Sequence, residues 1–341
     1  MKKRWKKKCL YLLRKYFLPQ KQMQGNGIFI TATDGIGDNI VRLCILEKML
    51  TMFGKERCWI LCEKKTKDFM RKIGFQHIIV FEPEHRKRVM GKFNLLKKIF
   101  QIPLQEIVSL EFDQHDFPIE FFSNTSTTGY DNIFHPEINQ YYKRSIENKS
   151  GNIENAVLHF YNEYFQEKLS IEEILPDITK YYRGVEEIKG VMTVGIGAGD
   201  RYKIMAPSVL GKILQRMIEI KKLHQVILLG FGPKEQKYVE ELRKYISFER
   251  YYVDTKVGKL SFEETIAEIQ KSQYYLGMDS GLFHVAASLR KQTFGLFTKK
   301  NPFTHDFWDN VTVFYGKESQ VEDYYGNSIL NGISIEEILD E

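Results

Sequence analysis

The stretch ITATDGIGDNIVRL, residues 30–43, has the pattern of a buried strand, a glycine-bearing turn and the start of an amphipathic helix. A strand that turns directly into a helix is the first half of a βαβ unit, from which parallel sheets are built. Gly35 and Gly37 match the first two glycines of the dinucleotide fingerprint G-x-G-x-x-G, but Ile40 stands at the third glycine position. The stretch therefore predicts an α/β fold and leaves the purpose of its turn open.

Two acidic residues, Asp34 and Asp38, also lie in this turn. Asp38 is unfavourable for a nucleotide diphosphate docked on the helix N-terminus, because both groups are negative. It suits a neutral ligand that carries protons, such as a sugar hydroxyl. The alternative is that Asp38 caps the helix, which is a common role of Asp. In the first interpretation, Asp34, Gly35 and Gly37 form the turn that holds Asp38 toward such a ligand.

Strand and helix patterns alternate on both sides of this stretch. Apolar strand patterns lie at 27–32, 57–63, 77–81 and 106–112 in the first half, and at 191–199, 225–232, 250–254, 274–279 and 293–298 in the second. Residues 113–150 are polar and poorly periodic, which predicts loops. A chain of 341 residues is long for a single core. The sequence therefore predicts two doubly wound, Rossmann-like domains that face each other across a central cleft, with ligands at the carboxyl ends of the strands.

The second half carries a turn suited to an anion. In YYLGMDSGLFHVAAS, residues 274–288, a buried strand leads directly onto a helix N-terminus. The first helical turn offers free backbone N–H groups, which bind phosphate. These groups belong to Ser280, Gly281 and Leu282. Asp279 either orients a sugar or caps the helix, and His284 is either a core residue or a donor to a diphosphate.

Two cations follow another glycine turn in GIGAGDRYKIMAP, residues 195–207. Arg201 and Lys203 come after the flexible Gly199 and just before a helix that begins with proline. Cations beside glycines at a strand end suit a diphosphate, and a solvated loop is the alternative. Gly230 ends the next strand in the same manner, and we assign it to the same nucleotide site.

Together these motifs resemble glycosyltransferase family 9, the ADP-heptose:lipopolysaccharide heptosyltransferase family. Their order is strand–GxGD–helix, then a glycine turn with Lys-x-x-x-Pro, then VILLGFGPKEQ, LGMDSGLFHVAAS and TFGLFTKKNP. The resemblance covers about residues 27–305, and DSGxxHxAA is its most specific piece. One departure is that the helix after Asp38 lacks the proline common in the family.

The resemblance implies a GT-B fold, in which two Rossmann-like domains take the acceptor and the nucleotide sugar. The expected parts are an N-terminal arm (1–23), an acceptor-side domain (24–178), a nucleotide-sugar-binding domain (179–320) and a C-terminal helix that packs back toward the domain junction (321–341). Asp38 is implied as the catalytic base, in an acceptor-side turn formed by Asp34, Gly35 and Gly37. Lys203 is implied as a contact to the donor diphosphate. The implied lining of the donor pocket is Asp279, Ser280, Gly281 and His284.

The implied activity is inverting, metal-independent transfer of a heptose or related sugar to a glycan or lipid-linked acceptor in lipopolysaccharide, lipooligosaccharide or capsule synthesis. The co-substrate is a nucleoside-diphosphate sugar, ADP-linked, with no other cofactor. The chain contains no Asp-x-Asp pair, which metal-dependent transferases commonly use. Three alternatives stay open. They are an NAD(P)-dependent Rossmann oxidoreductase, a sugar-nucleotide epimerase on the same fold, and a catalytically silent subunit of a glycan assembly complex.

The basic residues are concentrated at the N-terminus. Residues 1–21 carry nine of the 50 Lys and Arg and no acid, which leaves 41 basic against 44 acidic residues elsewhere and argues against a nucleic-acid-binding face. On a helix, Trp5, Cys9, Leu12 and Tyr16 share one side, and such a helix either lies in an anionic membrane surface or packs on the body. The apolar run is too short for a signal peptide or a membrane span. We expect a cytoplasmic protein that associates peripherally with the inner face of the cytoplasmic membrane.

Overall fold

The computed structural model describes residues 2–19, 22–111, 117–131, 136–148, 153–298, 308–317 and 329–334. It divides into two compact units, Met1–Ser170 and Ile171–Glu341. The boundary predicted from the sequence lies at residues 178 and 179, within the irregular segment that leads to the first strand of the second unit. Most of the predicted C-terminal helix (321–341) lies outside the described residues.

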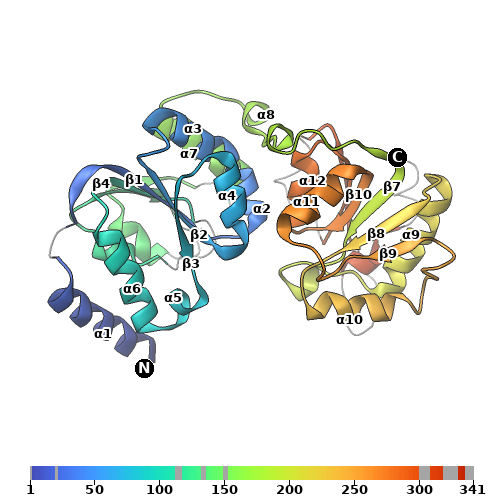
Figure 1. The fold of residues 1–341 in the computed structure, drawn as a ribbon, viewed down its shortest axis with the longest axis horizontal. Helices are drawn as coiled ribbons and strands as arrows, with labels where there is room; N and C mark the ends of the chain where they lie inside the picture. Colours follow the sequence, from blue (N-terminus) through green and yellow to red (C-terminus); the bar gives the residue numbers. More distant parts are fainter. Residues whose placement is uncertain are drawn as a thin grey trace. The chain divides into compact units, whose positions relative to one another are not determined.

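The first unit contains a six-stranded, fully parallel sheet (Figure 1). Its strands are β1 (Gln24–Ala32), β2 (Cys58–Glu63), β3 (His77–Phe81), β4 (Leu104–Ser109), β5 (Ser126–Tyr130) and β6 (Arg144–Ile146), in the order β3-β2-β1-β4-β5-β6. The helices are α1 (Lys2–Phe17), α2 (Ile36–Val41), α3 (Leu43–Phe53), α4 (Lys67–Ile73), α5 (Pro83–Lys87), α6 (Val89–Phe100) and α7 (Ile153–Phe165). The strand order reverses between β1 and β4, and ligands of doubly wound sheets bind at such a reversal.

Both faces of this sheet are covered, α6 lying on one side and α3 with α7 on the other (Figure 1). The central strand β1 therefore needs apolar side chains on both faces, and Ile28, Phe29 and Ile30 are all buried. Two strands, β5 and β6, lie in the segment 113–150 that the sequence predicted as loops. That expectation was wrong because β5 is short and polar, and it is held in the sheet by β4 and β6.

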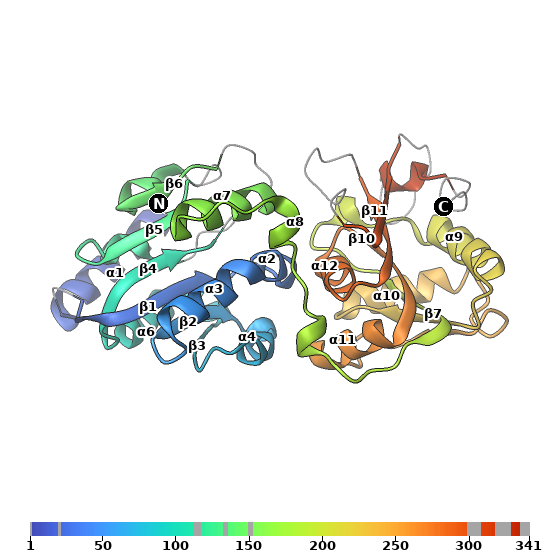
Figure 2. The same cartoon turned by 90° about the horizontal axis from the view of Figure 1, so that it is seen from above.

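The second unit repeats the architecture with a second six-stranded parallel sheet (Figure 2). Its strands are β7 (Ile188–Gly195), β8 (Gln225–Leu229), β9 (Val253–Thr255), β10 (Ser272–Met278), β11 (Gln292–Phe297) and β12 (Val311–Tyr315), in the order β12-β11-β10-β7-β8-β9. The helices are α8 (Ile171–Ile174), α9 (Pro207–Ile220), α10 (Pro233–Leu242), α11 (Phe262–Lys271) and α12 (Gly281–Ser288). The strand order reverses between β7 and β10, and a ligand crevice is expected there.

Helices α9 and α10 pack on one face of the second sheet, and α11 and α12 lie on the other. The apolar residues of α9, including Leu210, Leu214 and Met217, form one buried stripe against β7 and β8. Two sheets of six parallel strands, each with its own core, confirm the predicted pair of doubly wound domains.

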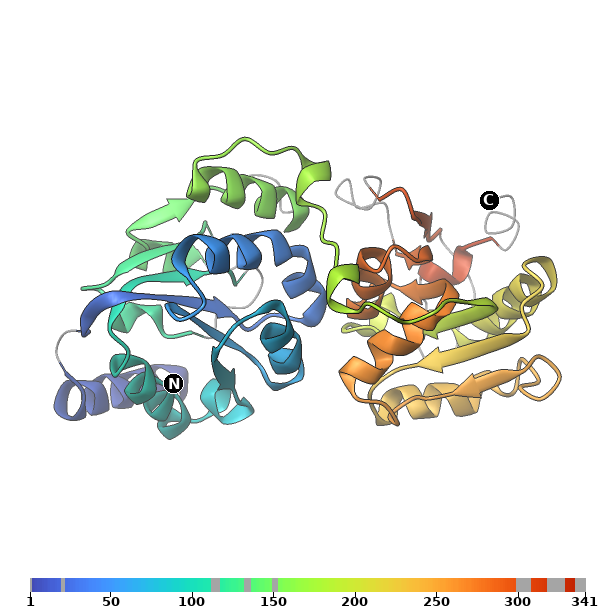
Figure 3. The ribbon, with the colours of Figure 1, turned by 45° about the horizontal axis from the view of Figure 1, so that its top comes forward.

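Helix α1 packs beside α6 in the first unit (Figure 3). Leu10 is buried on the body-facing side of the helix, and the Arg14 guanidinium lies 5.5 Å from the centre of the Phe100 ring. The side predicted as apolar faces away from the body, since Trp5 and Tyr16 are 66% and 70% exposed. In the described part of the chain, no helix combines the length and the apolar run that a membrane span needs.

Candidate active site

The opening turn of the first unit stands at the carboxyl end of β1, where the strand order reverses. Gly35 is the N-cap of α2, so the structure gives the capping position to the glycine and places Asp38 inside the first helical turn. A Cβ atom on Gly35 would lie 3.0 Å from Oδ2 of Asp38. The absence of a side chain at Gly35 therefore makes room for the Asp38 carboxylate, and Gly37 lies buried beside it.

Buried amide and hydroxyl groups hold the backbone of this turn. The Asn39 side chain donates hydrogen bonds to the carbonyl oxygens of Asp34 (3.1 Å) and Gly35 (2.9 Å). Thr33 donates a 2.6 Å hydrogen bond to Oε1 of Glu111, which follows β4. These contacts fasten the end of β1 to the end of β4, and a fixed backbone is what a positioned carboxylate needs.

Asp34 forms a buried ion pair with Arg42, in which Nη2 of Arg42 lies 2.6 Å from Oδ2 of Asp34. Arg42 also separates α2 from α3, since it is the C-cap of the first helix and the N-cap of the second. Burial lowers the pKa of Arg42, but Asp34 and Asp38 together raise it above its usual range, so the guanidinium stays charged. Asp34, predicted to face the acceptor, thus has Oδ2 engaged in this pair.

In the second unit, three predicted residues come together at the end of β10. Nζ of Lys203 lies 2.7 Å from Oδ2 of Asp279, and both side chains are about one-third exposed or less. Burial lowers the pKa of Lys203, whereas Asp279 raises it, and the net shift is upward. Burial also lowers the pKa of the nearby His284, with Asp279 acting against this and Lys203 with it. The cluster therefore combines a charged lysine with a neutral imidazole.

The helix α12 begins directly beside this cluster. Ser280 is its N-cap, with extended backbone and no side-chain capping bond, and Gly281 is the first helical residue. Leu282 is buried. An N-terminus without a capping side chain leaves its amide groups available to an anion.

A cavity of about 380 Å³ lies at the carboxyl ends of β7 and β8 in the same unit. Two predicted residues, Gly199 and Arg201, line it. The other lining residues are Ile196, Ala198, Ile204, Pro233, Lys234, Glu235, Lys237 and Tyr238. The volume falls within the range of small-ligand pockets.

Glu235 is the acidic residue among the lining residues that the sequence did not predict. If Gly197 or Gly232 carried a Cβ atom, that atom would lie 2.8 Å or 3.0 Å, respectively, from a carboxylate oxygen of Glu235. A Cβ atom on Gly230 would lie 2.9 Å from Cγ of Glu235. Three glycines from two strand ends thus make space for one acidic side chain. The signal in the sequence is the pair of glycine turns, GIGAG at 195–199 and GFG at 230–232, of which only Gly199 and Gly230 were assigned to the nucleotide site.

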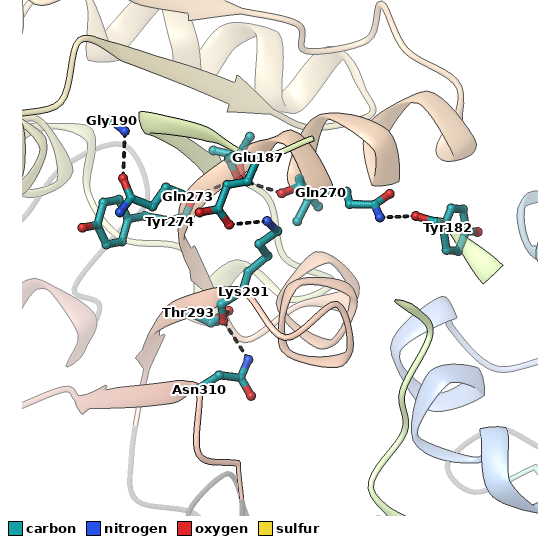
Figure 4. Close-up of polar contacts among 12 residues, drawn as sticks. Tyr182, Glu187, Gly190, Gln270, Gln273, Tyr274, Lys291, Thr293 and Asn310 are labelled. Carbon is teal, nitrogen blue, oxygen red and sulfur yellow. Dashed lines mark hydrogen bonds and ion pairs between the residues drawn. The ribbon is translucent and has the colours of Figure 1, made fainter. Parts of the chain in front are cut away.

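The opposite edge of this sheet is filled by structural contacts (Figure 4). Nζ of the buried Lys291 lies 2.7 Å from Oε2 of Glu187, and the N–H of Gly190 donates to Oε1 of Gln273 at 2.7 Å. The side chain of Asn310 donates to the Lys291 carbonyl at 2.7 Å. These polar groups pair with one another at the amino ends of the strands, whereas the predicted site residues of this unit follow the carboxyl ends. Among the described residues, no group of three or more His, Cys, Asp or Glu side chains is arranged to hold a metal ion.

Comparison with known proteins finds a sequence match to one family model. Residues 212–329 match the family model of glycosyltransferase family 9 (heptosyltransferase). No curated protein sequence matches the chain.

Similar solved structures include Escherichia coli heptosyltransferase WaaC with ADP, at 11% identity and a TM-score of 0.68, covering 92% of this chain and 98% of that one. E. coli ADP-heptose LPS heptosyltransferase II has 14% identity and a TM-score of 0.62 over 92% and 96% of the two chains. A family 9 glycosyltransferase from Veillonella parvula has 14% identity and a TM-score of 0.64 over 94% and 97%. These similarities show that the chain has the two-domain GT-B fold. The family 9 match over residues 212–329 and the shared fold confirm the predicted resemblance and the predicted class of enzyme, a glycosyltransferase.

Proposed function

We propose that the chain is an inverting, metal-independent glycosyltransferase of surface polysaccharide synthesis, either of lipopolysaccharide or of capsule. It transfers a heptose or a related sugar from a nucleoside-diphosphate donor to a glycan or lipid-linked acceptor. The observation that carries this proposal is the cluster of Lys203, Asp279 and His284 at the start of α12. A charged lysine beside an uncapped helix N-terminus suits a leaving group that gains negative charge.

The donor is ADP-linked in this proposal, with no cofactor besides this co-substrate. Support comes from the solved WaaC structures, which contain ADP and ADP-2-deoxy-2-fluoro heptose. In this chain Lys203 and Arg201 take the diphosphate, and Gly199 and Gly230 let the backbone approach it closely. Glu235, in the adjoining cavity, accepts hydrogen bonds from hydroxyl groups of the nucleoside.

The reaction is a single displacement. Asp38 takes the proton from the acceptor hydroxyl as that oxygen forms a bond with the anomeric carbon of the sugar. The bond between this carbon and the diphosphate oxygen breaks at the same time, and the electron pair stays on the departing nucleoside diphosphate. Lys203 and the N-terminus of α12 stabilise this charge, and attack from the opposite side inverts the configuration.

The ion pair of Lys203 with Asp279 prepares the site for the donor. Asp279 keeps the ammonium group of Lys203 charged and aimed at the end of β10 until the diphosphate arrives. When the diphosphate takes over the lysine, the Asp279 carboxylate becomes available to a hydroxyl group of the transferred sugar. Asp279 therefore orients the sugar after it has oriented the lysine.

Helix α1 brings the enzyme to a lipid-linked acceptor at the inner face of the cytoplasmic membrane. Its outward side carries Trp5, Leu12 and Tyr16, and the exposed Lys8 and Lys15 flank them. Exposed aromatic rings beside basic residues suit an anionic lipid surface, where each basic residue contributes about 1 kcal/mol.

A thermal-shift panel of ADP-, GDP- and UDP-linked sugars tests the donor class, with NAD(P)H as the competing ligand. We expect the ADP-linked sugar to give the largest shift, because a ligand at 100 times its Kd stabilises the folded chain by about 2.7 kcal/mol. A shift with NAD(P)H and with none of the nucleotide sugars would contradict the proposal in favour of an oxidoreductase.

The variant Asp38→Asn tests the base. We expect it to keep the thermal shift with the donor but to lose release of ADP from ADP-heptose in the presence of a glycolipid fraction, since an amide cannot accept the proton. Turnover that needs no acceptor and releases no ADP would instead indicate an epimerase.

A further inference from the structure

Tyr275 in β10 is a buried residue that the proposed mechanism does not use. Its side chain is 0% exposed and lies along the strand toward Gly277, which pairs with Gly195 of β7. A Cβ atom added to Gly195 would lie only 2.1 Å from the Tyr275 hydroxyl oxygen, and one added to Gly277 would lie only 2.4 Å from it. Two glycines of the central strands therefore leave the space that the phenol group of Tyr275 occupies.

The hydroxyl group of Tyr275 lies next to Ser280, the N-cap of α12. Burial raises the pKa of Tyr275, and Ser280 is the group that acts against this rise. Both Oη of Tyr275 and Oγ of Ser280 are buried, and neither has a hydrogen-bond partner of regular geometry among the described residues. Buried hydroxyl groups without partners are uncommon, because each loses its hydrogen bonds to water without replacement.

An anion at the start of α12 would satisfy both hydroxyl groups at once. Ser280 makes no capping bond with its side chain, so its O–H can turn toward a ligand at the helix N-terminus. Tyr275 then has an acceptor in Ser280 Oγ, and hydrogen bonds in such a chain strengthen one another. An apolar side chain in place of Tyr275 would fill the same space but would leave Ser280 unoriented.

We propose that Tyr275 is a positioning residue of the donor site, acting through Ser280. When the diphosphate binds, the Tyr275 O–H donates to Ser280 Oγ, and the Ser280 O–H donates to a phosphate oxygen. This inference rests on the proposed function, since it requires a nucleoside diphosphate at α12. It assigns Tyr275 to the phosphates alone and not to the nucleoside.

Isothermal titration with ADP and with adenosine tests the assignment in the full-length chain. We expect Tyr275→Phe to weaken ADP binding about 3- to 10-fold, the range of one neutral hydrogen bond. Adenosine affinity should not change, because adenosine has no phosphate. Ser280→Ala should weaken ADP binding at least as much, and adding Tyr275→Phe to it should cause no further loss.

The matched control is Tyr142→Phe, which removes the same oxygen from a buried tyrosine of the first unit. It should leave the affinity for ADP unchanged. Equal losses for ADP and adenosine in Tyr275→Phe would mean a structural role and would overturn the inference, as would an unchanged ADP affinity. A full effect of Tyr275→Phe in the Ser280→Ala background would overturn the relay through Ser280.

The wild-type chain separates this inference from the proposed function. If it binds none of ADP, GDP and UDP, the proposed function fails. If it binds one of them and Tyr275→Phe binds that nucleotide equally well, only the role of Tyr275 fails. Where the preferred nucleotide is GDP or UDP, guanosine or uridine replaces adenosine in the comparison.

Discussion

The buried ion pair between Arg42 and Asp34 makes the sharpest stability prediction. The side chains are 0% and 4% exposed and lie 2.6 Å apart, so neither charge reaches water if its partner is removed. Removing one partner of a buried pair costs about 3–5 kcal/mol. We therefore expect Arg42→Met or Asp34→Ala to lower the urea midpoint of the first unit by roughly 1.5–2.5 M, at an m-value of about 2 kcal/mol/M.

The assay is urea unfolding followed by tryptophan fluorescence. Of the three tryptophans, Trp5 and Trp59 belong to the first unit and Trp308 to the second. A Trp308→Phe background therefore restricts the emission to the first unit, where Trp59 stacks on His77 with ring centres 4.2 Å apart. Loss of that stacking reports the unfolding of this unit.

The matched control is Lys48→Met, which breaks the ion pair of Lys48 with Glu167 in the same unit. Both of these side chains are about one-third exposed, and exposed pairs contribute less than about 1 kcal/mol. The reasoning would be refuted if Arg42→Met lowered the midpoint no more than Lys48→Met does. The double variant of Arg42 and Asp34 should cost less than the sum of its parts, because no unpaired charge of that pair stays buried.

Three further predictions concern the second unit and the N-terminal helix. Lys203→Ala should weaken ADP binding about tenfold or more in calorimetry, since a charge-assisted hydrogen bond is lost, whereas Lys256→Ala in the same unit should not. His284 should favour folding in its neutral form, because burial lowers its pKa. The stability that neutral His284 contributes is present above the pKa of about 6.5 that it has in the unfolded chain, and it is lost as the pH falls through its lower pKa in the folded chain. The difference in urea midpoint between wild type and His284→Asn should therefore be smaller at pH 5 than at pH 7.5, and a constant difference would contradict this prediction. Replacing Trp5 and Tyr16 by Ser should reduce sedimentation with phosphatidylglycerol vesicles without changing ADP affinity, and equal sedimentation would exclude α1 as a membrane contact.

Local patterns predicted much of the fold, because the residues that decide them are neighbours in the chain. Ser261 and Glu264 form the capping box that begins α11. The Glu264 N–H donates to Ser261 Oγ at 3.2 Å, and the Ser261 N–H donates to Glu264 Oε2 at 2.7 Å. The spacing of these two residues in the sequence is enough to predict the box. The strand before Asp279 follows equally from an apolar run that ends at Met278, and the helix after it begins at Gly281. These elements needed no knowledge of distant contacts.

Other features could not be predicted, since they depend on residues far apart in the sequence. Glu235 reads as an ordinary acidic residue in the first turn of α10, and its place in the cavity depends on glycines from two separate loops. Strand β5 is polar, and only its pairing with β4 and β6 makes it a strand. Tyr275 reads as an aromatic residue of a buried strand, and the room for its hydroxyl group comes partly from Gly195, eighty residues earlier.

Arg42 explains why the opening turn tolerates two acidic residues. Its backbone N–H donates to the Asp38 carbonyl oxygen, and its guanidinium pairs with the Asp34 carboxylate. Without that cation, the two carboxylates of the turn would repel each other with no opposite charge beside them. With it, Asp34 is neutralised by its partner, and the turn keeps one net negative charge. A general base must be ionised to accept a proton, and the buried pair thus supplies the electrostatic condition that the proposed role of Asp38 requires.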